Sequence, residues 1–444
     1  MSNRLSFAAP VCRPHLAVWL LVLALVPVRV WFAWNHGDSP TFYDEGDYHR
    51  IAARLAAGEG FSGTYGPTAF RPPGQPLFLA AVYSVFGTSV RHAYVAQALL
   101  ASMLPLLTMW FARSELKHPG WASLAGALTA LHPGIAYAST TLYPVVLTSV
   151  CLVVGVGYVR RAALRESRWS AVAAGLALGM AGLATPYLSP LVGIGAVLLT
   201  LRGRVYRGLV VAVVGLLPLG LWVARNAEVL GAPVLGTHGG YNLALGANDR
   251  ASVFSGNAIE PDLPRAEAPD DEIARDRAYR EVALDWITRN PERWLTLAAG
   301  RALATLDSTG RPATGQAPRG AIVWVIGLGV TAAVVAGLAG VVLARRRIAA
   351  QLVVATFVLV LVSAAATISK PRFRFPGDPL LGVYGLVLVR AVMSRLTRRS
   401  SRSTVVAIAG GLRACSRTTA GRRGPADVDP RGEHRRGRPP SSRC

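Results

Sequence analysis

The sequence has little charge for its length and few cysteines. Of its 444 residues, 16% are charged and 4 are cysteines. A soluble globular domain usually carries about 25% charged residues, so the composition argues against that class. Cys151 falls in an apolar stretch, and Cys12, Cys415 and Cys444 lie in segments that we expect in the cytoplasm, so no disulfide framework is predicted. No His, Cys and Asp residues have metal-ligand spacing, and no metal site is predicted.

Hydrophobic residues, by contrast, make up 52% of the chain, and its mean hydropathy is +0.37. A helix needs about 20 apolar residues to cross the hydrocarbon of a bilayer, and runs of this length recur along the chain. We therefore predict an all-α polytopic membrane protein. Ten transmembrane helices are expected, at 17–35, 91–112, 120–138, 142–160, 169–185, 187–202, 206–224, 320–343, 350–369 and 379–395. A shorter run at 76–87 is predicted to be an interfacial helix.

The loops between these segments alternate in charge. Short loops rich in Lys and Arg stay in the cytoplasm. Such loops contain Arg113 and Lys117, Arg160 to Arg168, Arg202 to Arg207, Arg345 to Arg347, and Arg395 to Arg399. The links at 139–141 and near 186 have neither residue, and the segment 225–319 is balanced in charge. Both termini are therefore predicted in the cytoplasm, and the loops 36–90 and 225–319 on the outer face of the cytoplasmic membrane.

The net charge of +23 follows this topology and does not indicate nucleic acid. The domain organisation predicted is a cytoplasmic N-terminus at 1–16, a membrane domain at 17–395 and a basic tail at 396–444. The tail is rich in Ser, Arg, Gly and Pro, so we expect it to be disordered. Anionic lipid headgroups of the bilayer are its expected contact.

The first outer loop carries an unusual acidic stretch, TFYDEGDYHRIAARLAAGEG, at 41–60. After Pro40, the residues Tyr48, Ile51, Ala52 and Leu55 repeat at helical spacing, which predicts a short amphipathic helix on the membrane surface. Asp44 and Glu45 then fall at its start. A purely structural explanation also fits, because Thr41 and Asp44 have capping-box spacing and acids are favoured near a helix N-terminus.

Five segments in order resemble the bacterial integral membrane glycosyltransferases of the GT-C class. They are DEGDYHRIAARLAAGEGF, TAFRPPGQPLFLA, LPLGLWVARNAEVLGAPVLGTHGGYNLALGAN, DWITRNPERW and KPRFRFPGDPLL. The similarity spans about residues 17–392 and is to relatives of the protein O-mannosyltransferases and the lipid A aminoarabinose transferase. These enzymes take a sugar from a polyprenyl phosphate. The resemblance implies such a donor here, with a glycan, lipid or protein as acceptor.

The resemblance also implies roles for the acidic stretch. The family's outer-loop DExxY pattern matches Asp44, Glu45 and Tyr48, and its acid acts as catalytic base. Asp44 would take the proton of an acceptor hydroxyl as that oxygen attacks the anomeric carbon with inversion. Glu45 would orient an arginine or the acceptor. Asp47 is expected to pair with Arg50 or Arg54 on the same helix.

The departing phosphate calls for cations on the outer face. The sequence offers Arg71 in FRPPG, Arg225 in ARN, and Lys370, Arg372 and Arg374 in KPRFRFP. Each could instead be a headgroup contact or a snorkelling anchor at a helix end. His238 and Tyr241 could contact a sugar, although a structural histidine is the commoner case. Some relatives of this class bind a metal, but we predict none for this chain.

Two segments depart from the family pattern. Many relatives have a Glu after the third span, where this chain reads STTLYPVV at 139–146, and an Arg after the fifth, where it reads LATPYLSP. A lipid-linked sugar transporter, or a non-catalytic envelope-assembly protein, is the alternative. A transporter predicts ionisable residues midway along the helices, and the sequence offers few, chiefly Arg29 and His132.

Overall fold

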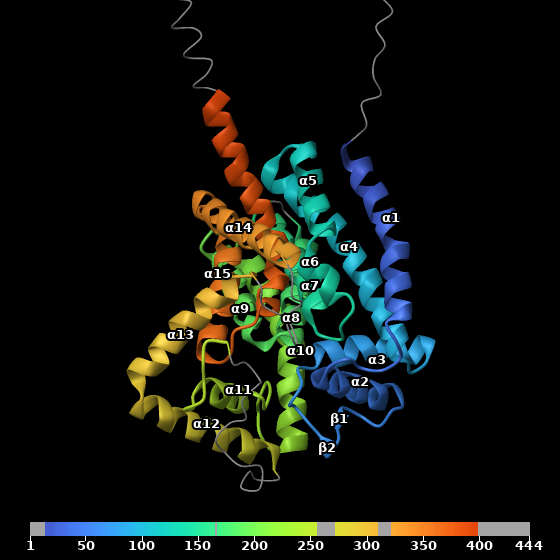
Figure 1. Ribbon diagram of the computed structural model, residues 1–444, viewed down its shortest axis with the longest axis vertical. Coiled ribbons are helices and arrows are strands. Elements are labelled where there is room, and N and C mark those ends of the chain that lie inside the picture. Colours follow the sequence, from blue (N-terminus) through green and yellow to red (C-terminus); the bar gives the residue numbers. More distant parts are fainter. Residues whose placement is uncertain (1–13, 165–166, 255–270, 310–320, 398–444) are drawn as a thin grey trace, which may run out of the picture. The chain divides into compact units, whose positions relative to one another are not determined.

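The computed structural model describes residues 14–164, 167–254, 271–309 and 321–397. Within these ranges the chain is helical apart from one two-stranded hairpin (Figure 1), which confirms the predicted all-α class. Residues up to Val389 belong to one compact unit, and the description below concerns that unit. Nearly all of the predicted N-terminal segment and of the basic tail lies outside the described residues.

Seven of the described helices are long and apolar enough to cross a membrane. They are α1 (Pro14–Asn35), α4 (Val90–Leu116), α7 (Val145–Leu164), α10 (Val205–Leu230), α14 (Ala321–Leu343), α15 (Ile348–Ala366) and the span Phe375–Thr397. Large apolar side chains such as Leu23 and Trp31 on α1 and Leu221 on α10 are more than 60% exposed. Apolar surface on this scale is suited to lipid and not to water. The chain is therefore a multi-pass membrane protein.

The other three predicted spans are shorter or interrupted. They form α5 (Pro119–Ala130) with α6 (Pro133–Ala138), α8 (Arg168–Ala184), and the 3-10 turn η1 (Pro186–Leu188) with α9 (Pro190–Thr200). Proline has no backbone N–H to continue a helix and restricts the residue before it, so Pro133 and Pro186 each end the preceding run. The ten predicted segments are thus all helical, but only seven are continuous helices of spanning length.

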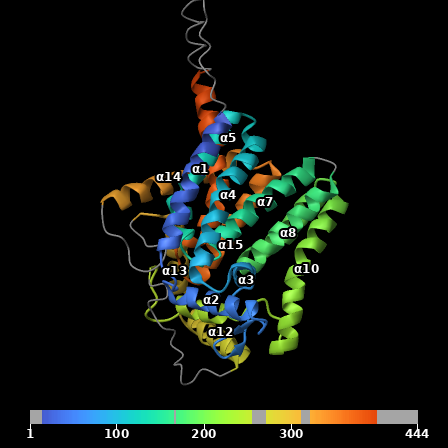
Figure 2. The same cartoon turned by 90° about the vertical axis from the view of Figure 1, so that its right-hand side faces the viewer.

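The two sets of predicted loops lie at opposite ends of the bundle. Figure 1 places α2 (Tyr43–Ala56), α3 (Gly74–Phe86), α11 (Gly239–Gly246) and α12 (Glu272–Arg289) at its lower end, with the hairpin β1 (Ser62–Gly63) and β2 (Gly66–Pro67). The helix α13 (Pro291–Leu306) leads from α12 back toward the bundle. The view in Figure 2 shows α8 and α10 packed side by side, with the lower part of α10 reaching down to the level of this layer. The arginine-rich loops contact one another at the other end, as in the bond from Arg207 to the Ala162 carbonyl. This separation agrees with the predicted alternation of loops.

The amphipathic helix predicted in the first outer loop is present as α2. Its apolar stripe does not face a membrane surface, however, because Tyr48, Ile51 and Ala52 are buried inside the protein. They pack within a core that includes Leu79 and Tyr83 of α3. The predicted interfacial helix, now α3, is likewise packed on α2, α4 and α8. The apolar stripe of α2 thus packs inside the protein, whereas α3 also leaves Leu77, Val85 and Phe86 exposed. The position of both helices at a membrane surface stays a prediction.

A close approach between α3 and α8 fixes the segment that carries Arg71. A Cβ atom on Gly74 would come within 2.6 Å of the Ala184 backbone nitrogen, so only glycine fits at this contact. Pro72 and Pro73 precede this glycine and limit the backbone conformations of the turn. The FRPPG segment is thus anchored to the bundle immediately beside its arginine.

Candidate active site

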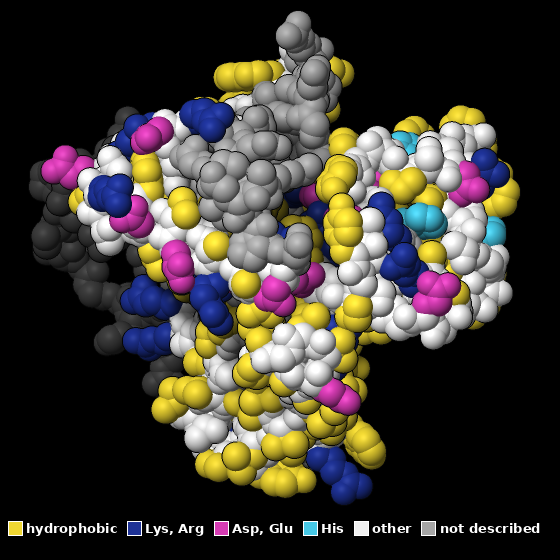
Figure 3. All heavy atoms as spheres, turned by 90° about the horizontal axis from the view of Figure 1, so that it is seen from below, with side chains coloured by type: hydrophobic (Ala, Val, Ile, Leu, Met, Phe, Trp, Pro, Cys, Tyr) yellow, Lys and Arg dark blue, Asp and Glu magenta, His cyan; other side chains and the backbone are white. Residues whose placement is uncertain are grey.

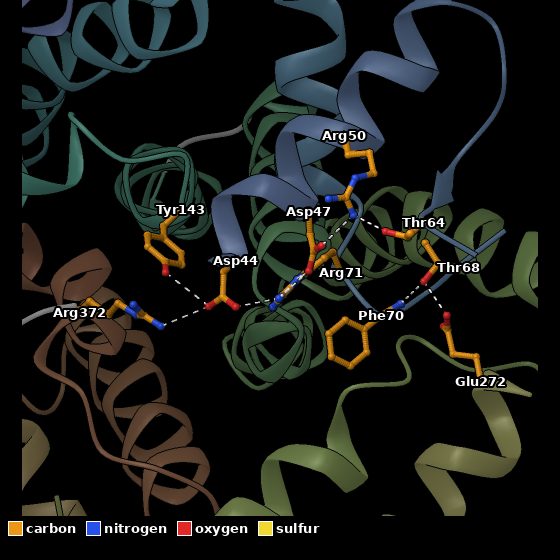
Figure 4. A network of polar contacts seen from close by, with 10 residues as sticks. All are labelled: Asp44, Asp47, Arg50, Thr64, Thr68, Phe70, Arg71, Tyr143, Glu272 and Arg372. Atoms are coloured by element: carbon orange, nitrogen blue, oxygen red, sulfur yellow. Dashed lines mark hydrogen bonds and ion pairs between the residues drawn. The ribbon is translucent and has the colours of Figure 1, made fainter. Parts of the chain in front are cut away.

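Asp44 lies in the first turn of α2, but it does not cap the helix. The N-cap residue is Phe42, which is extended and makes no side-chain capping bond. The Asp44 carboxylate instead points away from the helix end (Figure 4), where its Oδ1 atom accepts a 2.7 Å hydrogen bond from Nη2 of Arg71. Its Oδ2 atom lies 3.4 Å from the Tyr143 hydroxyl and 3.8 Å from Nη2 of Arg372. The capping-box explanation of Asp44 is therefore wrong.

Arg71 is the centre of the carboxylate cluster. Its Nε and Nη2 atoms donate to Oδ2 of Asp47 at 3.1 and 2.8 Å, and Nη2 also reaches Asp44. The guanidinium lies over the rings of Tyr48, at 5.7 Å, and Phe70, at 4.9 Å. Burial lowers the pKa of Arg71, but the neighbouring carboxylates outweigh it and the net direction is upward. Arg71 thus stays charged and holds Asp44 in place, with two of its nitrogens already committed.

Asp47 pairs with Arg50, as predicted, and also with Arg71. Its strongest contacts are with Arg71, whereas Arg50 approaches its other oxygen at only 3.4 Å. Arg54 donates to the carbonyl of Gly63 in the hairpin and does not contact Asp47. Arg50 is thus the partner that helical spacing predicted, and FRPPG adds a closer guanidinium from 24 residues away.

Glu45 is fully buried, unlike Asp44. Its carboxylate accepts hydrogen bonds from the backbone nitrogens of Thr41, at 2.9 Å, and Leu142, at 3.1 Å, and from the Tyr94 hydroxyl, at 3.1 Å. Burial raises the pKa of Glu45, and the backbone donors partly oppose that rise. Among the described residues Glu45 contacts no arginine, so it does not orient one, and a role in orienting the acceptor stays a prediction. It fastens α2 to the link before α7 and so positions Tyr143.

Arg372 and Lys370 bring positive charge to the other side of Asp44. Lys370 immediately precedes a 3-10 turn, η3 (Pro371–Phe373), and Arg372 lies within it and stacks over the Tyr143 ring at 4.2 Å. Its 3.8 Å approach to Asp44 is longer than a hydrogen bond, and its side chain is 11% exposed. Burial, with the charge of Arg372, lowers the pKa of Lys370, whose amine has no hydrogen-bond or ion-pair partner in the described part of the chain. These two cations keep donors for a ligand.

Arg374 occupies a different environment although it is only two residues further on. It is fully buried, and Nε and Nη2 pair with the Asp378 carboxylate at 2.8 to 3.2 Å. Its remaining donors reach the carbonyls of Thr305 and Leu306 and the hydroxyl of Ser308. The predicted phosphate contact of Arg374 therefore does not fit, because all of its nitrogens are used inside the protein.

Arg225 is also used structurally. From α10 its guanidinium donates to the carbonyls of Thr68, at 2.9 Å, and Phe61, at 2.8 Å, and it stacks on the Trp222 ring at 5.1 Å. These bonds fasten α10 to the first outer loop. The cation set expected around a phosphate therefore reduces to Lys370 and Arg372, with Arg71 bound to the carboxylates.

Two tyrosines that the sequence reasoning missed complete the site. Tyr143 belongs to STTLYPVV and contacts both Asp44 and Arg372. Tyr187 belongs to LATPYLSP and donates a 3.1 Å hydrogen bond to the Phe373 carbonyl, next to Arg372. Both segments are those that depart from the family pattern. The signal available in the sequence was a tyrosine beside a proline in an outer link without Lys or Arg.

A contact between the two outer loops covers this region. Glu272, at the start of α12, accepts hydrogen bonds from the Thr68 hydroxyl, at 2.6 Å, and the Ala69 nitrogen, at 2.8 Å (Figure 4). It also accepts one from the Thr237 hydroxyl. The sequence gave no indication of this role, because Glu272 is one of several acids in its segment. The loops 36–90 and 225–319 are thereby joined directly beside Phe70 and Arg71.

His238 and Tyr241 both approach Phe70, whose ring centroid lies 6.5 and 6.2 Å from theirs. Burial lowers the pKa of His238 to about 4, so the imidazole is neutral at physiological pH. Its Nδ1 atom is buried without a hydrogen-bond partner among the described residues. These contacts suit the structural histidine that was favoured. Figure 3 shows side chains of both charge signs and exposed histidines on this face of the molecule.

The arrangement was compared with known proteins. No protein-family model matches the sequence, and no curated protein matches it. The fold is similar to that of the archaeal oligosaccharyltransferase AglB from Archaeoglobus fulgidus in complex with an inhibitory peptide and a dolichol-phosphate, with 13% identity and a TM-score of 0.47 over 88% of this chain. The chain spans about half the length of that protein, 52%. ArnT from Cupriavidus metallidurans bound to undecaprenyl phosphate is 19% identical, with a TM-score of 0.41 over 84% of this chain and 78% of ArnT.

Proposed function

We propose that this protein is a membrane glycosyltransferase that moves a sugar from a polyprenyl-phosphate donor to an acceptor hydroxyl on the outer face of the membrane, with inversion. The observation that supports it best is the placement of Asp44. Its carboxylate is freed from helix capping and lies between Arg71 and Arg372, in a layer made by the two outer loops. A carboxylate that is held by one cation and faces another is suited to take the proton of an acceptor while the second cation binds the phosphate.

In the proposed reaction the acceptor oxygen attacks the anomeric carbon of the donor. A new C–O bond forms to the acceptor, the C–O bond to the phosphate breaks, and its electron pair leaves on the phosphate oxygen. The acceptor proton passes to Asp44, whose Oδ1 atom is occupied by Arg71 while Oδ2 is the oxygen available for a ligand. Because phosphate leaves as an anion, no general acid is needed, unlike in a glycoside hydrolase.

Arg372 and Lys370 are the proposed ligands of that phosphate. Charge grows on the leaving oxygen during the transfer, and fixed cations in a site of low dielectric stabilise it. Tyr143 holds the Arg372 guanidinium by stacking and simultaneously bonds the carboxylate. The same tyrosine therefore sets the relative position of the base and the phosphate ligand.

The test is to replace Asp44 with Asn in the full-length protein. Envelope glycolipids, glycans and glycoproteins are first compared by mass spectrometry in cells with and without the gene, which identifies the transferred sugar and its acceptor. In membranes from cells expressing Asp44→Asn, the rate of that transfer should fall by roughly 10² to 10⁴, the range for a lost general base. Donor binding and thermal stability should stay close to wild type, because Asn keeps the size and one acceptor oxygen.

Asp47→Asn is the matched control, since Asp47 lies on the same helix and bonds the same arginine but contacts neither Tyr143 nor Arg372. It should lower the rate far less than Asp44→Asn. A wild-type rate for Asp44→Asn, or equal losses in the two variants, would show that the carboxylates act only by holding Arg71.

The transporter alternative gains no support from its principal residue. Arg29 on α1 donates a 2.6 Å hydrogen bond to the carbonyl of Ala130, which the break between α5 and α6 leaves without a helical partner. His132 lies 3.3 Å from Asp378, beside the buried Arg374 pair. Both residues thus satisfy groups exposed by helix ends and form no line of ionisable groups across the bundle.

A further inference from the structure

A second cluster of charged side chains lies at the opposite end of the bundle, among the arginine-rich loops. It surrounds a cavity of about 280 Å³ where the ends of α4, α7 and α9 meet the start of α15. Its charged lining residues are Glu115, Lys117, Arg160, Arg202, Arg346 and Arg347. Five cations therefore face one carboxylate, and three of them, Lys117, Arg346 and Arg347, are exposed at the mouth of the cavity.

Glu115 neutralises only two of these cations. Its buried carboxylate accepts a 2.5 Å hydrogen bond from Nε of Arg160 and a 2.9 Å bond from Nη1 of Arg347. Arg160 also donates to the Ser114 carbonyl, and Arg347 to that of Glu115 itself. This triad joins α4, α7 and the start of α15, and it forms the floor on which the remaining cations are arranged.

The other three cations retain their charge. Arg202 bonds only neutral acceptors, among them Oε1 of Gln351 at 2.8 Å and the carbonyl of Leu198. In the described part of the chain, the Lys117 amine and the Arg346 guanidinium have no hydrogen-bond or ion-pair partner. Lys117 also adopts a left-handed backbone, φ 51°, at the end of α4, a conformation that usually selects Gly or Asn. Lys117 thus adopts a backbone conformation that is unfavourable for a lysine.

We propose that this cavity binds the phosphate of an anionic phospholipid from the cytoplasmic leaflet. The charge-based topology places these loops on the cytoplasmic side, where anionic lipids concentrate and basic pockets between helices bind their headgroups. The apolar side chains nearby would receive the acyl chains, because Leu164 at the cavity is 63% exposed, and Leu201 and Leu343 at neighbouring helix ends are 77% and 48% exposed. A phosphate without acyl chains would leave this apolar rim uncovered.

The experiment uses the full-length protein in nanodiscs, with lipid binding measured by native mass spectrometry and by titration. Phosphatidylglycerol should be retained in preference to phosphatidylcholine. The double variant Lys117→Gln with Arg346→Gln should weaken phosphatidylglycerol binding about 25-fold, which is about fivefold, or about 1 kcal/mol, for each cation near an anionic surface. Inorganic phosphate at millimolar concentration is the second probe and should not displace the lipid.

The matched control is Arg113→Gln with Arg345→Gln. It also removes two positive charges, one from each of the same two loops, but neither Arg113 nor Arg345 lines the cavity. This control should retain wild-type lipid affinity. Equal weakening in both double variants, equal binding of phosphatidylcholine, or displacement by inorganic phosphate alone would each overturn the proposal. Because the cavity and Asp44 lie at opposite ends of the bundle, either result leaves the proposed transfer reaction to its own test.

Discussion

Arg372 and Arg374 are two residues apart in KPRFRFP, yet the structure predicts opposite consequences for replacing them with Gln. The Arg374 side chain is fully buried and pairs with Asp378, which is itself 3% exposed. Removing one partner of such a pair leaves a buried charge uncompensated and typically costs about 3 to 5 kcal/mol of folding free energy. This is a large part of the roughly 10 kcal/mol by which a typical domain is stable. Arg374→Gln should therefore sharply lower the thermal midpoint and the amount of folded protein.

Arg372→Gln should leave the fold intact. Its contact with Asp44 is long, and the stacking lost from Tyr143 is worth about 1 kcal/mol or less at a partly exposed site. If Arg372 binds the donor phosphate, the lost charge-assisted hydrogen bonds cost about 1.5 to 3 kcal/mol, which is about a tenfold to hundredfold loss of affinity. Binding of undecaprenyl phosphate to the purified variant would measure this.

The assay pairs that binding measurement with scanning fluorimetry on both variants in the same detergent. The reasoning requires a stable Arg372→Gln with weak binding and an unstable Arg374→Gln. It is refuted if Arg374→Gln is as stable as wild type but loses binding, because the buried pair would then be exposed to ligand. It is equally refuted if Arg372→Gln binds undecaprenyl phosphate normally. Lys370→Gln serves as a second test of the same anion site.

Two further predictions concern the aromatic and histidine contacts. Tyr143→Phe keeps the ring beneath Arg372 but loses the 3.4 Å bond to Asp44, so transfer should slow about twofold to tenfold at unchanged donor affinity. Tyr143→Ala removes the ring as well and should also weaken donor binding. Equal behaviour of the two variants would contradict the dual role of Tyr143. The pKa of His238 is lowered to about 4 from an ordinary value of 6.5, so the unfolded chain takes up a proton that the folded protein refuses. Stability should therefore fall as the pH drops from about 6.5 toward 4, and His238→Gln should show a flatter pH dependence of its thermal midpoint; identical slopes would show that His238 does not titrate in this way.

The sequence was sufficient to predict the membrane helices, because the hydrocarbon of a bilayer permits few backbone structures. A run of about 20 apolar residues must satisfy its backbone internally, so α1, α10 and α14 could be located from composition alone. The start of α2 near Asp44 was also predictable, because Pro40 and the helical spacing after it are local signals. Prolines within the apolar runs interrupted two of the predicted segments, 120–138 and 187–202, an effect visible locally but difficult to place to the residue.

Which charged residues meet was decided by the tertiary structure. Local spacing correctly predicted the pair of Asp47 with Arg50, but only the FRPPG turn, fixed by Gly74 against α8, brings Arg71 to the same carboxylate. In the same way, nothing in KPRFRFP distinguishes Arg374, which is buried against Asp378, from Arg372. Tyr143 could not be assigned to the site because its contacts with Asp44 and Arg372 join residues 99 and 229 positions apart. Side-chain partners depend on how the helices pack, and local sequence patterns do not specify which distant residues come into contact.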